Sequence, residues 1–433
     1  MKLAKVLLAN VWSDRNKGDY AITLGTIKCL KRIYPNVEIV LMSMFGANEF
    51  KYVSSEYRLL SSHADKVVGG LYPTYFSYGY EKMTRICQRI LDIYSFFTSL
   101  VKLILISISR KMRARILPIK ELVDSDLVIL VGGNYINSSN VFGAIFYLFR
   151  VLYPALVCII LKKPYIMLGH TIWNINDVVS RVLLRYVVDR SLLVVVREEV
   201  SYRFLIRDIK TKNRVFVLPD LAFALANEVG NHKAIPRNSL IIGFSLRQWN
   251  FPKARDPKAS MENYRKAISR FIEFLRTKYN AKILLIPLGS GPLVIEHDFL
   301  ECLEIFKRVN QLGGVHIAKK PSSLQDIFEL YSGLNIHVGV RLHSIIFASM
   351  CDVPSIAIGY QGHKTLGVAK QLGLSKYYVD ITNVSAEKLI LLFEKLQQES
   401  DVIKTTLSNR VKALHYELFT KLVYLMKRSL SIC

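Results

Sequence analysis

The chain has 433 residues, enough for two domains of ordinary size, and 51% of them are hydrophobic. The formal net charge is +25, with 59 Lys and Arg against 34 Asp and Glu, which favours an anionic partner such as a small substrate or a membrane surface. The basic residues are scattered and the sequence has no nucleic-acid-binding motif, so we expect no nucleic-acid partner.

The six cysteines are far apart in the sequence and form no CxxC pair, which argues against a zinc or redox dithiol site. They are typical of free, buried thiols in a reducing compartment. The first ten residues have a basic start but too few apolar residues for a signal peptide, and we interpret them as the first strand. The sequence therefore predicts a cytoplasmic protein.

The N-terminal segment predicts a β-α-β unit. A strand ends at Asn10, and a loop with Asn16, Gly18 and Asp19 leads into a helix expected over Tyr20–Ile33, after which a second strand follows. Asp19 is a suitable N-cap, and the N-terminus of this helix is suited to hold an anion. The alternative is an ordinary strand–turn–helix connection with a routine glycine.

An apolar insert occupies residues 71–120. Ile93–Ser109 is a 17-residue apolar run with one lysine. Four basic residues follow this run: Arg110, Lys111, Arg113 and Arg115. The run is at the short limit for a membrane span, so we expect a helix in or near an anionic membrane surface, with a helix packed on the sheet as the alternative. The apolar stretch 141–161 predicts a core helix over the sheet, with a membrane-facing patch as the alternative.

Three later strands of the first half end in residues suited to ligand contact. The first ends in Gly132 and Gly133, which allow close approach of a ligand to the backbone. The next two end in His170 and in Arg197. The alternatives are a tight turn for the glycines and a structural ion pair with Glu198 for Arg197.

A polar segment, residues 226–238, is the best candidate for a linker, and a second α/β half follows it. The first strand of this half ends in Arg247. The last part of the chain predicts helices, and its end is amphipathic with basic residues at intervals. This end is expected either to return to the first half or to add membrane contact.

Two buried strands close together in the second half frame the candidate site. The strand Leu334–Val340 delivers Arg341 and His343 into a strand-to-helix turn, and Ser344 is suited to cap the helix that follows. After a proline, a second buried strand covers Ser355–Gly359.

The loop after the second strand holds Tyr360, His363 and Lys364, and we expect His363 to be exposed to solvent. Carboxyl ends of neighbouring parallel strands meet at one edge of a sheet, where open α/β sheets bind ligands. Arg341, His343 and Lys364 are therefore expected to lie together. A guanidinium, an imidazole and an ammonium group suit a small polyanion and one proton transfer. The alternative is a salt-bridged loop with a core histidine.

Alternating strands and helices in both halves predict an α/β fold of two doubly wound, Rossmann-like domains facing a cleft, which is the GT-B geometry. We assign residues 1–225 to the N-terminal domain, 226–385 to the C-terminal domain and 386–433 to a helical tail.

Several separate blocks, in the right order from about residue 3 to 380, resemble the polysaccharide pyruvyl transferase family, most closely its colanic-acid-type members of capsule and exopolysaccharide clusters. The blocks are Asn16–Ala21, Val131–Gly133, Leu168–Thr171, Val196–Ser201, Pro219–Phe223, Phe244–Arg247, Val340–Ser344 and Tyr360–Gly367. Two features depart from the family pattern. Ile172–Asn174 stands where members usually have Gly-Pro, and the insert at 71–120 is unusually apolar.

The resemblance implies transfer of pyruvate from phosphoenolpyruvate (PEP) to a sugar, giving a ketal that bridges two hydroxyls, with PEP on the C-terminal domain and the acceptor on the N-terminal domain. It implies catalytic roles for His343, which would protonate the methylene carbon, and for Lys364 and Arg341. The remaining residues matched to substrate binding are Arg247, Arg197, Gly132, Gly133, Asn16, Gly18, Asp19, His170 and Tyr360.

PEP is expected as donor substrate with no cofactor, and no metal is expected because no His/Asp/Glu cluster has ligand spacing. The expected partners are PEP, a glycan or lipid-linked sugar, and an anionic membrane surface at the inner face of the plasma membrane. Two alternatives stay open: a GT-B glycosyltransferase that uses a nucleotide sugar, and an inactive, membrane-attached scaffold of polysaccharide assembly.

Overall fold

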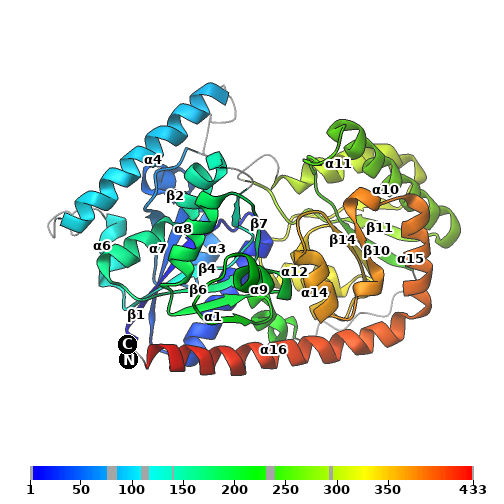
Figure 1. Ribbon diagram of the computed structural model, residues 1–433. Coiled ribbons are helices and arrows are strands. Elements are labelled where there is room, and N and C mark those ends of the chain that lie inside the picture. The colour runs from blue at the N-terminus through cyan, green and yellow to red at the C-terminus, as the bar shows by residue number, and fades with distance from the viewer. Residues whose placement is uncertain are drawn as a thin grey trace. The chain divides into compact units, whose positions relative to one another are not determined.

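The computed structural model describes residues 3–75, 85–108, 117–138, 141–230, 239–291 and 296–431. The chain forms two compact units, each with its own parallel sheet (Figure 1). Unit 1 comprises Met1–Asp14, Asp19–Ala224 and Glu417–Cys433, and unit 2 comprises Arg15–Gly18 and Leu225–Tyr416.

Unit 1 is built on a seven-stranded sheet in the order β3-β2-β1-β4-β6-β8-β9, in which every pairing is parallel. Its strands are β1 (Lys5–Val11), β2 (Glu38–Gly46), β3 (Lys66–Gly70), β4 (Leu127–Val131), β6 (Tyr165–His170), β8 (Leu193–Val196) and β9 (Val215–Val217). The strands are almost continuously buried, as in sheets covered on both faces. A separate parallel pair, β5 (Ile136–Ser138) and β7 (Ile172–Ile175), forms where the sequence departs from the family's Gly-Pro.

The helices of unit 1 connect these strands. They are α1 (Lys17–Ile33), α2 (Ala47–Val53), η1 (Ser54–Tyr57), α3 (Arg58–Ser61), α4 (Arg85–Ile108), α6 (Leu117–Asp124), η3 (Gly143–Leu148), α7 (Phe149–Leu161), α8 (Val178–Val188), α9 (Glu199–Arg203), η4 (Phe204–Asp208) and η5 (Leu221–Val229). The first two residues of α1 belong to unit 2, and η5 runs on into unit 2. Most of α7 is buried and contacts β1 and β4, so the core helix expected over 141–161 is confirmed.

Unit 2 has a six-stranded parallel sheet in the order β12-β11-β10-β13-β14-β15. Its strands are β10 (Ile241–Ser245), β11 (Lys282–Leu285), β12 (Val315–Ile317), β13 (Ile336–Gly339), β14 (Ser355–Gly359) and β15 (Tyr378–Asp380). Its helices are α10 (Pro257–Tyr279), α11 (Asp298–Val309), η7 (Asn310–Leu312), α12 (Leu324–Ser332), α13 (Leu342–Met350), α14 (Lys364–Gln371), η8 (Ser375–Tyr377), η9 (Ile381–Asn383) and α15 (Ala386–Gln398).

Local signals explain where the helices begin and end. Asp256 caps α10 by accepting the Ala259 N–H at 2.9 Å, Pro257 occupies its first turn, and Asn280 ends it with a positive φ of 47°. The cap predicted for α13 is wrong. The helix begins at Leu342, and the Ser344 hydroxyl donates to a backbone carbonyl instead of accepting an N–H.

The chain ends in the long helix α16 (Ser400–Leu430), which belongs to unit 2 up to Tyr416 and to unit 1 from Glu417. Residues 386–433 therefore do not form a separate tail. The segment Arg15–Gly18, predicted in the N-terminal domain, groups with unit 2. The predicted linker lies partly outside the described residues, at 231–238. Two doubly wound α/β units confirm the fold class, and the cleft between them stays a prediction.

Candidate functional site

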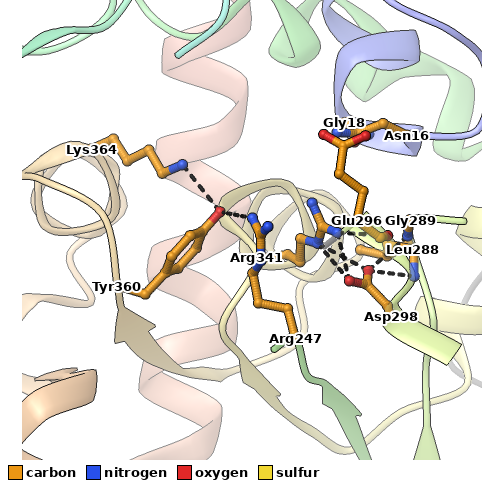
Figure 2. Close-up of polar contacts among 10 residues, drawn as sticks. All are labelled: Asn16, Gly18, Arg247, Leu288, Gly289, Glu296, Asp298, Arg341, Tyr360 and Lys364. Carbon is orange, nitrogen blue, oxygen red and sulfur yellow. Dashed lines mark hydrogen bonds and ion pairs between the residues drawn. The ribbon is translucent and has the colours of Figure 1, made fainter. Parts of the chain in front are cut away.

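The candidate site in unit 2 lies where the strand order of its sheet reverses. β10 and β13 are neighbours, with β11 and β12 on one side and β14 and β15 on the other. Open α/β sheets bind ligands at the carboxyl ends of strands beside such a reversal. Arg247 follows β10, Arg341 and His343 follow β13, and Tyr360 and Lys364 follow β14. Five predicted site residues therefore lie at the ends of three adjacent strands, and Figure 2 shows four of them.

Two cations meet at one phenol oxygen in this site. Arg247 Nη1 donates to the Tyr360 hydroxyl oxygen at 2.7 Å, and Lys364 Nζ donates to the same atom at 3.2 Å (Figure 2). The guanidinium carbon of Arg247 and the Nζ of Lys364 also lie 4.8 and 4.7 Å from the centre of the Tyr360 ring. All three residues are at most 8% exposed. Buried cationic donors at this density suit an anionic ligand group.

Arg341 is held by a carboxylate that the sequence analysis missed. Its Nε lies 2.9 Å from Asp298 Oδ2, and its Nη2 donates to Asp298 Oδ1 and to the Glu296 carbonyl. Asp298 also accepts the N–H groups of Leu288 and Gly289. Burial disfavours the charged guanidinium, but Asp298 raises the pKa of Arg341 above its usual value. Because its charge is compensated, Arg341 is suited to position the loop rather than to carry the ligand's charge.

The N-terminal loop of the chain reaches the histidine of this site. Asn16 pairs with Gly289 in an antiparallel bridge, next to the Asp298 carboxylate (Figure 2). Gly18 packs directly on the imidazole, because a Cβ on Gly18 would lie 2.1 Å from His343 Nδ1. His343 itself is half-buried in the first turn of α13. Asn16, Gly18 and His343 are therefore brought together within unit 2, although no sequence pattern links them.

The predicted N-cap of α1 is wrong. The helix begins at Lys17, and Asn16 Oδ1 accepts the Gly18 N–H at 3.1 Å, as an N-cap does. Asp19 lies in the first turn and, within unit 1, accepts a hydrogen bond from the Tyr135 hydroxyl. A ligand role for Asp19 stays a prediction.

In unit 1 the strand order reverses between β1 and β4, and Gly132 and Gly133 follow β4. A Cβ on Gly132 would lie 2.2 Å from the Gly169 carbonyl oxygen. A Cβ on Gly133 would lie 2.2 Å from the Tyr135 ring. Gly132 therefore meets fixed backbone and requires glycine for packing inside unit 1, whereas a side chain at Gly133 would require the Tyr135 ring to shift. Contact of either glycine with substrate stays a prediction.

The other two predicted binding residues of unit 1 are buried. His170 Nε2 donates to the Leu130 carbonyl oxygen at 3.1 Å, and burial lowers the pKa of His170 to about 4, so the imidazole is neutral at physiological pH. Arg197 Nη1 donates to Asp220 at 2.7 Å, and its Nε donates to the Thr171 hydroxyl at 2.7 Å. Arg197 and Asp220 thus form an ion pair. This buried pairing favours a structural role for Arg197 over the predicted substrate contact.

His363 is exposed, as predicted. Cys29, Cys158 and Cys302 are buried, whereas Cys87 and Cys351 are half-buried. Cys433 lies outside the described residues. In the part of the chain that the structure describes, no group of three or more His, Cys, Asp or Glu side chains is placed to hold a metal ion. A reaction without metal or cofactor stays a prediction.

The two parallel sheets define an α/β protein of the GT-B-like class. HepE from Anabaena, in complex with UDP and glucose, has a TM-score of 0.55 and 12% identity, covering 99% of this chain and 100% of HepE. The S. aureus MnaA–UDP structure has a TM-score of 0.58 and 11% identity, covering 100% and 98%. UDP-GlcNAc 2-epimerase from Neisseria meningitidis, bound to UDP-GlcNAc, has a TM-score of 0.54 and 12% identity, covering 98% and 100%. At these identities the likeness shows the fold alone.

The chain belongs to the polysaccharide pyruvyl transferase family, whose sequence model matches residues 16–362. The amylovoran biosynthesis protein AmsJ of Erwinia amylovora is 23% identical over 273 residues, or 61% of this chain. The match spans 64% of the length of AmsJ. The predicted family is thus confirmed, and the chain is a member of a transferase family with a relative in exopolysaccharide biosynthesis.

Proposed function

We propose that this protein transfers pyruvate from PEP to two hydroxyl groups of a sugar in a bacterial surface polysaccharide or its lipid-linked precursor. The products are a pyruvate ketal and phosphate. The observation that carries this proposal is the convergence of Arg247 and Lys364 on one buried phenol oxygen, at strand ends next to the one that bears His343. Family membership supplies the reaction class.

Unit 2 is the PEP side in this proposal. PEP carries a carboxylate and a phosphate, and both groups bind best to charged, bidentate or converging donors. Arg247 and Lys364 supply such donors. Arg341 fixes the shape of the loop through Asp298 and Gly289, beside the bound anion. Unit 1 is the acceptor side.

His343 is the proposed acid. An imidazole is the side chain whose ordinary pKa lies nearest neutral pH, which suits proton transfer to the methylene carbon of PEP. Protonation makes the neighbouring carbon electrophilic, and the first sugar hydroxyl adds to it. The bond from that carbon to the phosphate oxygen then breaks, and the second hydroxyl adds. Each sugar hydroxyl releases one proton. Of these two protons, one balances the proton gained by the methylene carbon, and the other leaves on hydrogen phosphate. Lys364 stabilises the charge on the departing phosphate.

We infer that the reaction takes place in the cytoplasm, because Cys29, Cys158, Cys302 and Cys351 are free thiols, and free thiols persist in a reducing compartment.

The test is phosphate release from PEP in the presence of a panel of glycan and lipid-linked acceptors, with the mass gain of the acceptor as a second readout. His343→Gln should lower turnover by roughly 10²- to 10⁴-fold. His316→Gln is the matched control, because His316 is exposed on β12. Release of nucleotide from a sugar nucleotide, with none of phosphate from PEP, would instead identify a glycosyltransferase. Inactivity with both donors would favour the scaffold alternative.

A further inference from the structure

Tyr360 receives two hydrogen bonds from groups that cannot accept one in return. A guanidinium and an ammonium group carry only donors, and both point at the same phenol oxygen. Among the described residues, no hydrogen bond runs from the Tyr360 hydroxyl to an acceptor. A neutral phenol therefore leaves its own proton without a good acceptor here, whereas a phenolate satisfies both donors with its full charge.

The charges that face Tyr360 come from three elements. Arg247 follows β10, Arg341 follows β13 and Lys364 opens α14, while the Trp249 ring packs edge-on at 5.0 Å between centroids. Burial by itself raises the pKa of Tyr360, but the three cations outweigh burial and lower this pKa to about 7. Arg341 contributes least, and its own charge is paired with Asp298.

We propose that Tyr360 is a phenolate in the ligand-free protein and acts as a built-in counter-anion for Arg247 and Lys364. An incoming phosphate or carboxylate group takes over the two cations, and the phenolate takes up one proton from solvent. The resulting hydroxyl is then a donor that faces the bound anion. Anion binding is thereby coupled to proton uptake. The identity of the anion as PEP rests on the proposed function, whereas the ionisation of Tyr360 does not.

A spectroscopic titration tests the ionisation without any assay of activity. Phenolate absorbs in a near-ultraviolet band where phenol does not, so the folded protein is titrated from about pH 5 to pH 9. One of its 23 tyrosines should ionise near neutral pH, and Tyr360→Phe should abolish this signal. Tyr378→Phe is the matched control in the same unit and should keep the signal, because burial raises the pKa of Tyr378 to about 12.

A second measurement tests the coupling. At about pH 8, saturating inorganic phosphate or PEP should remove the phenolate band and take up one proton per bound anion, as measured by calorimetry in buffers of different ionisation enthalpy. In Tyr360→Phe the same binding should take up no proton. A folded protein with no tyrosine ionising below about pH 9, or a band that neither anion changes, would overturn the proposal. An intact band with no phosphate release from PEP would reject only the proposed function.

A different observation, in unit 1, carries a second proposal. One face of α4 is apolar and exposed, along residues spaced three and four apart: Ile90, Ile93, Phe97, Val101, Ile104 and Ile108. Their exposed fractions run from 44% to 76%. With 3.6 residues per turn, this spacing forms one continuous stripe. The segment Ile86–Ile108 is long and apolar enough to cross a membrane. An 18-residue window within it has a mean hydropathy of 1.7, and 17% of that window is buried.

The opposite face of α4 is fixed to the protein. Ser95 and Ser99 are buried there, and the Tyr153 hydroxyl of α7 donates to the Ser99 carbonyl at 3.0 Å. The Phe96 and Phe149 rings also meet at 5.0 Å between centroids. Figure 1 shows α4 along the outer edge of unit 1. A helix that crossed a bilayer would have to leave these contacts, whereas a helix lying flat on a bilayer keeps them.

We propose that α4 docks in the plane of an anionic lipid bilayer, with the stripe at the boundary between head groups and acyl chains. An exposed apolar stripe of this length is unusual on a protein that faces water alone. The charge selects lipid over a protein partner: the chain carries a net +25, and four basic residues follow the helix in sequence within residues 110–115. Such docking would hold unit 1 beside a lipid-linked acceptor.

Vesicle flotation tests this docking with the full-length protein. It should float with phosphatidylglycerol vesicles and not with phosphatidylcholine vesicles, and salt should weaken the binding. Phe97→Asp and Ile104→Asp should each lower partitioning roughly ten- to a hundredfold. Leu391→Asp is the control, since Leu391 is an exposed aliphatic residue of α15 in unit 2. Equal binding to both lipids, unchanged binding of the stripe variants, or resistance to alkaline carbonate extraction, which indicates a spanning helix, would overturn the proposal.

Discussion

The buried ion pair between Arg341 and Asp298 allows a quantitative prediction for unit 2. Asp298 is 1% exposed and accepts hydrogen bonds from Arg341 and from the N–H groups of Leu288 and Gly289. Asp298→Asn keeps the shape of the side chain but removes the negative charge, so the guanidinium loses its carboxylate partner inside the protein. Removal of one partner of a buried ion pair lowers the free energy of unfolding by about 3–5 kcal/mol.

An exposed pair provides the matched control. Lys404 lies 3.3 Å from Asp401, whose side chain is 97% exposed. Water and salt screen such a pair, so Asp401→Asn should change stability by about 1 kcal/mol or less. The two substitutions are chemically identical, and burial is the main difference between the sites.

Hydrogen exchange measures the effect within unit 2 alone, which avoids treating two units as one unfolding transition. Peptides that cover residues 336–350 should exchange faster in Asp298→Asn by roughly two to three and a half orders of magnitude. Adding Arg341→Met should restore part of the loss, since the second substitution removes the uncompensated charge. A change below about 1 kcal/mol, or additive effects in the double variant, would refute the idea that this pair is coupled and desolvated.

Two further predictions concern packing and pH. Gly18→Ala would place a methyl group 2.1 Å from His343 Nδ1, so phosphate release should fall by at least about tenfold while the far-ultraviolet circular dichroism stays unchanged. Gly333→Ala is the control and should leave phosphate release unchanged, because Gly333 has an ordinary right-handed backbone conformation. Burial lowers the pKa of His170 to about 4 and that of His337 to about 3, against about 6.5 in the unfolded chain. The unfolded chain therefore binds more protons below pH 6.5, and each histidine should lower the free energy of unfolding by roughly 1.4 kcal/mol per pH unit as the pH falls from 6.5 towards its folded pKa. Urea titrations at several pH values should show this slope, and an equally steep slope in His170→Gln would contradict the assignment to His170.

The strands and the positions of most site residues could be predicted because they depend on local signals. The run Ser355–Gly359 is β14 residue for residue, since an unbroken apolar run between a proline and a polar loop allows little else. Once β13 and β14 are parallel neighbours, Arg341 and Lys364 must follow their carboxyl ends. The sequence therefore allowed us to predict that cationic residues lie at the carboxyl edge of this sheet.

The interaction partners of these residues could not be predicted from the sequence. Asp298 stands 43 positions before Arg341, and no motif or spacing in the sequence links the two residues. The contact of Gly18 with His343 joins segments more than three hundred positions apart. Such contacts depend on tertiary packing, which neither periodicity nor spacing records.

The partner decides what each arginine can do in this protein. Arg197 and Arg341 are each paired with a buried aspartate, Asp220 in unit 1 and Asp298 in unit 2, and the carboxylate cancels the charge of the guanidinium. Arg247 donates instead to Tyr360, which is neutral or anionic according to its proton. A carboxylate in the place of Tyr360 would keep its negative charge when an anionic substrate arrives. Its displacement from the cations would therefore carry a large electrostatic penalty. A phenolate becomes neutral when it takes up a proton. The charges of Arg247 and Lys364 can therefore be compensated before the substrate binds, and both side chains can bind the substrate when it arrives.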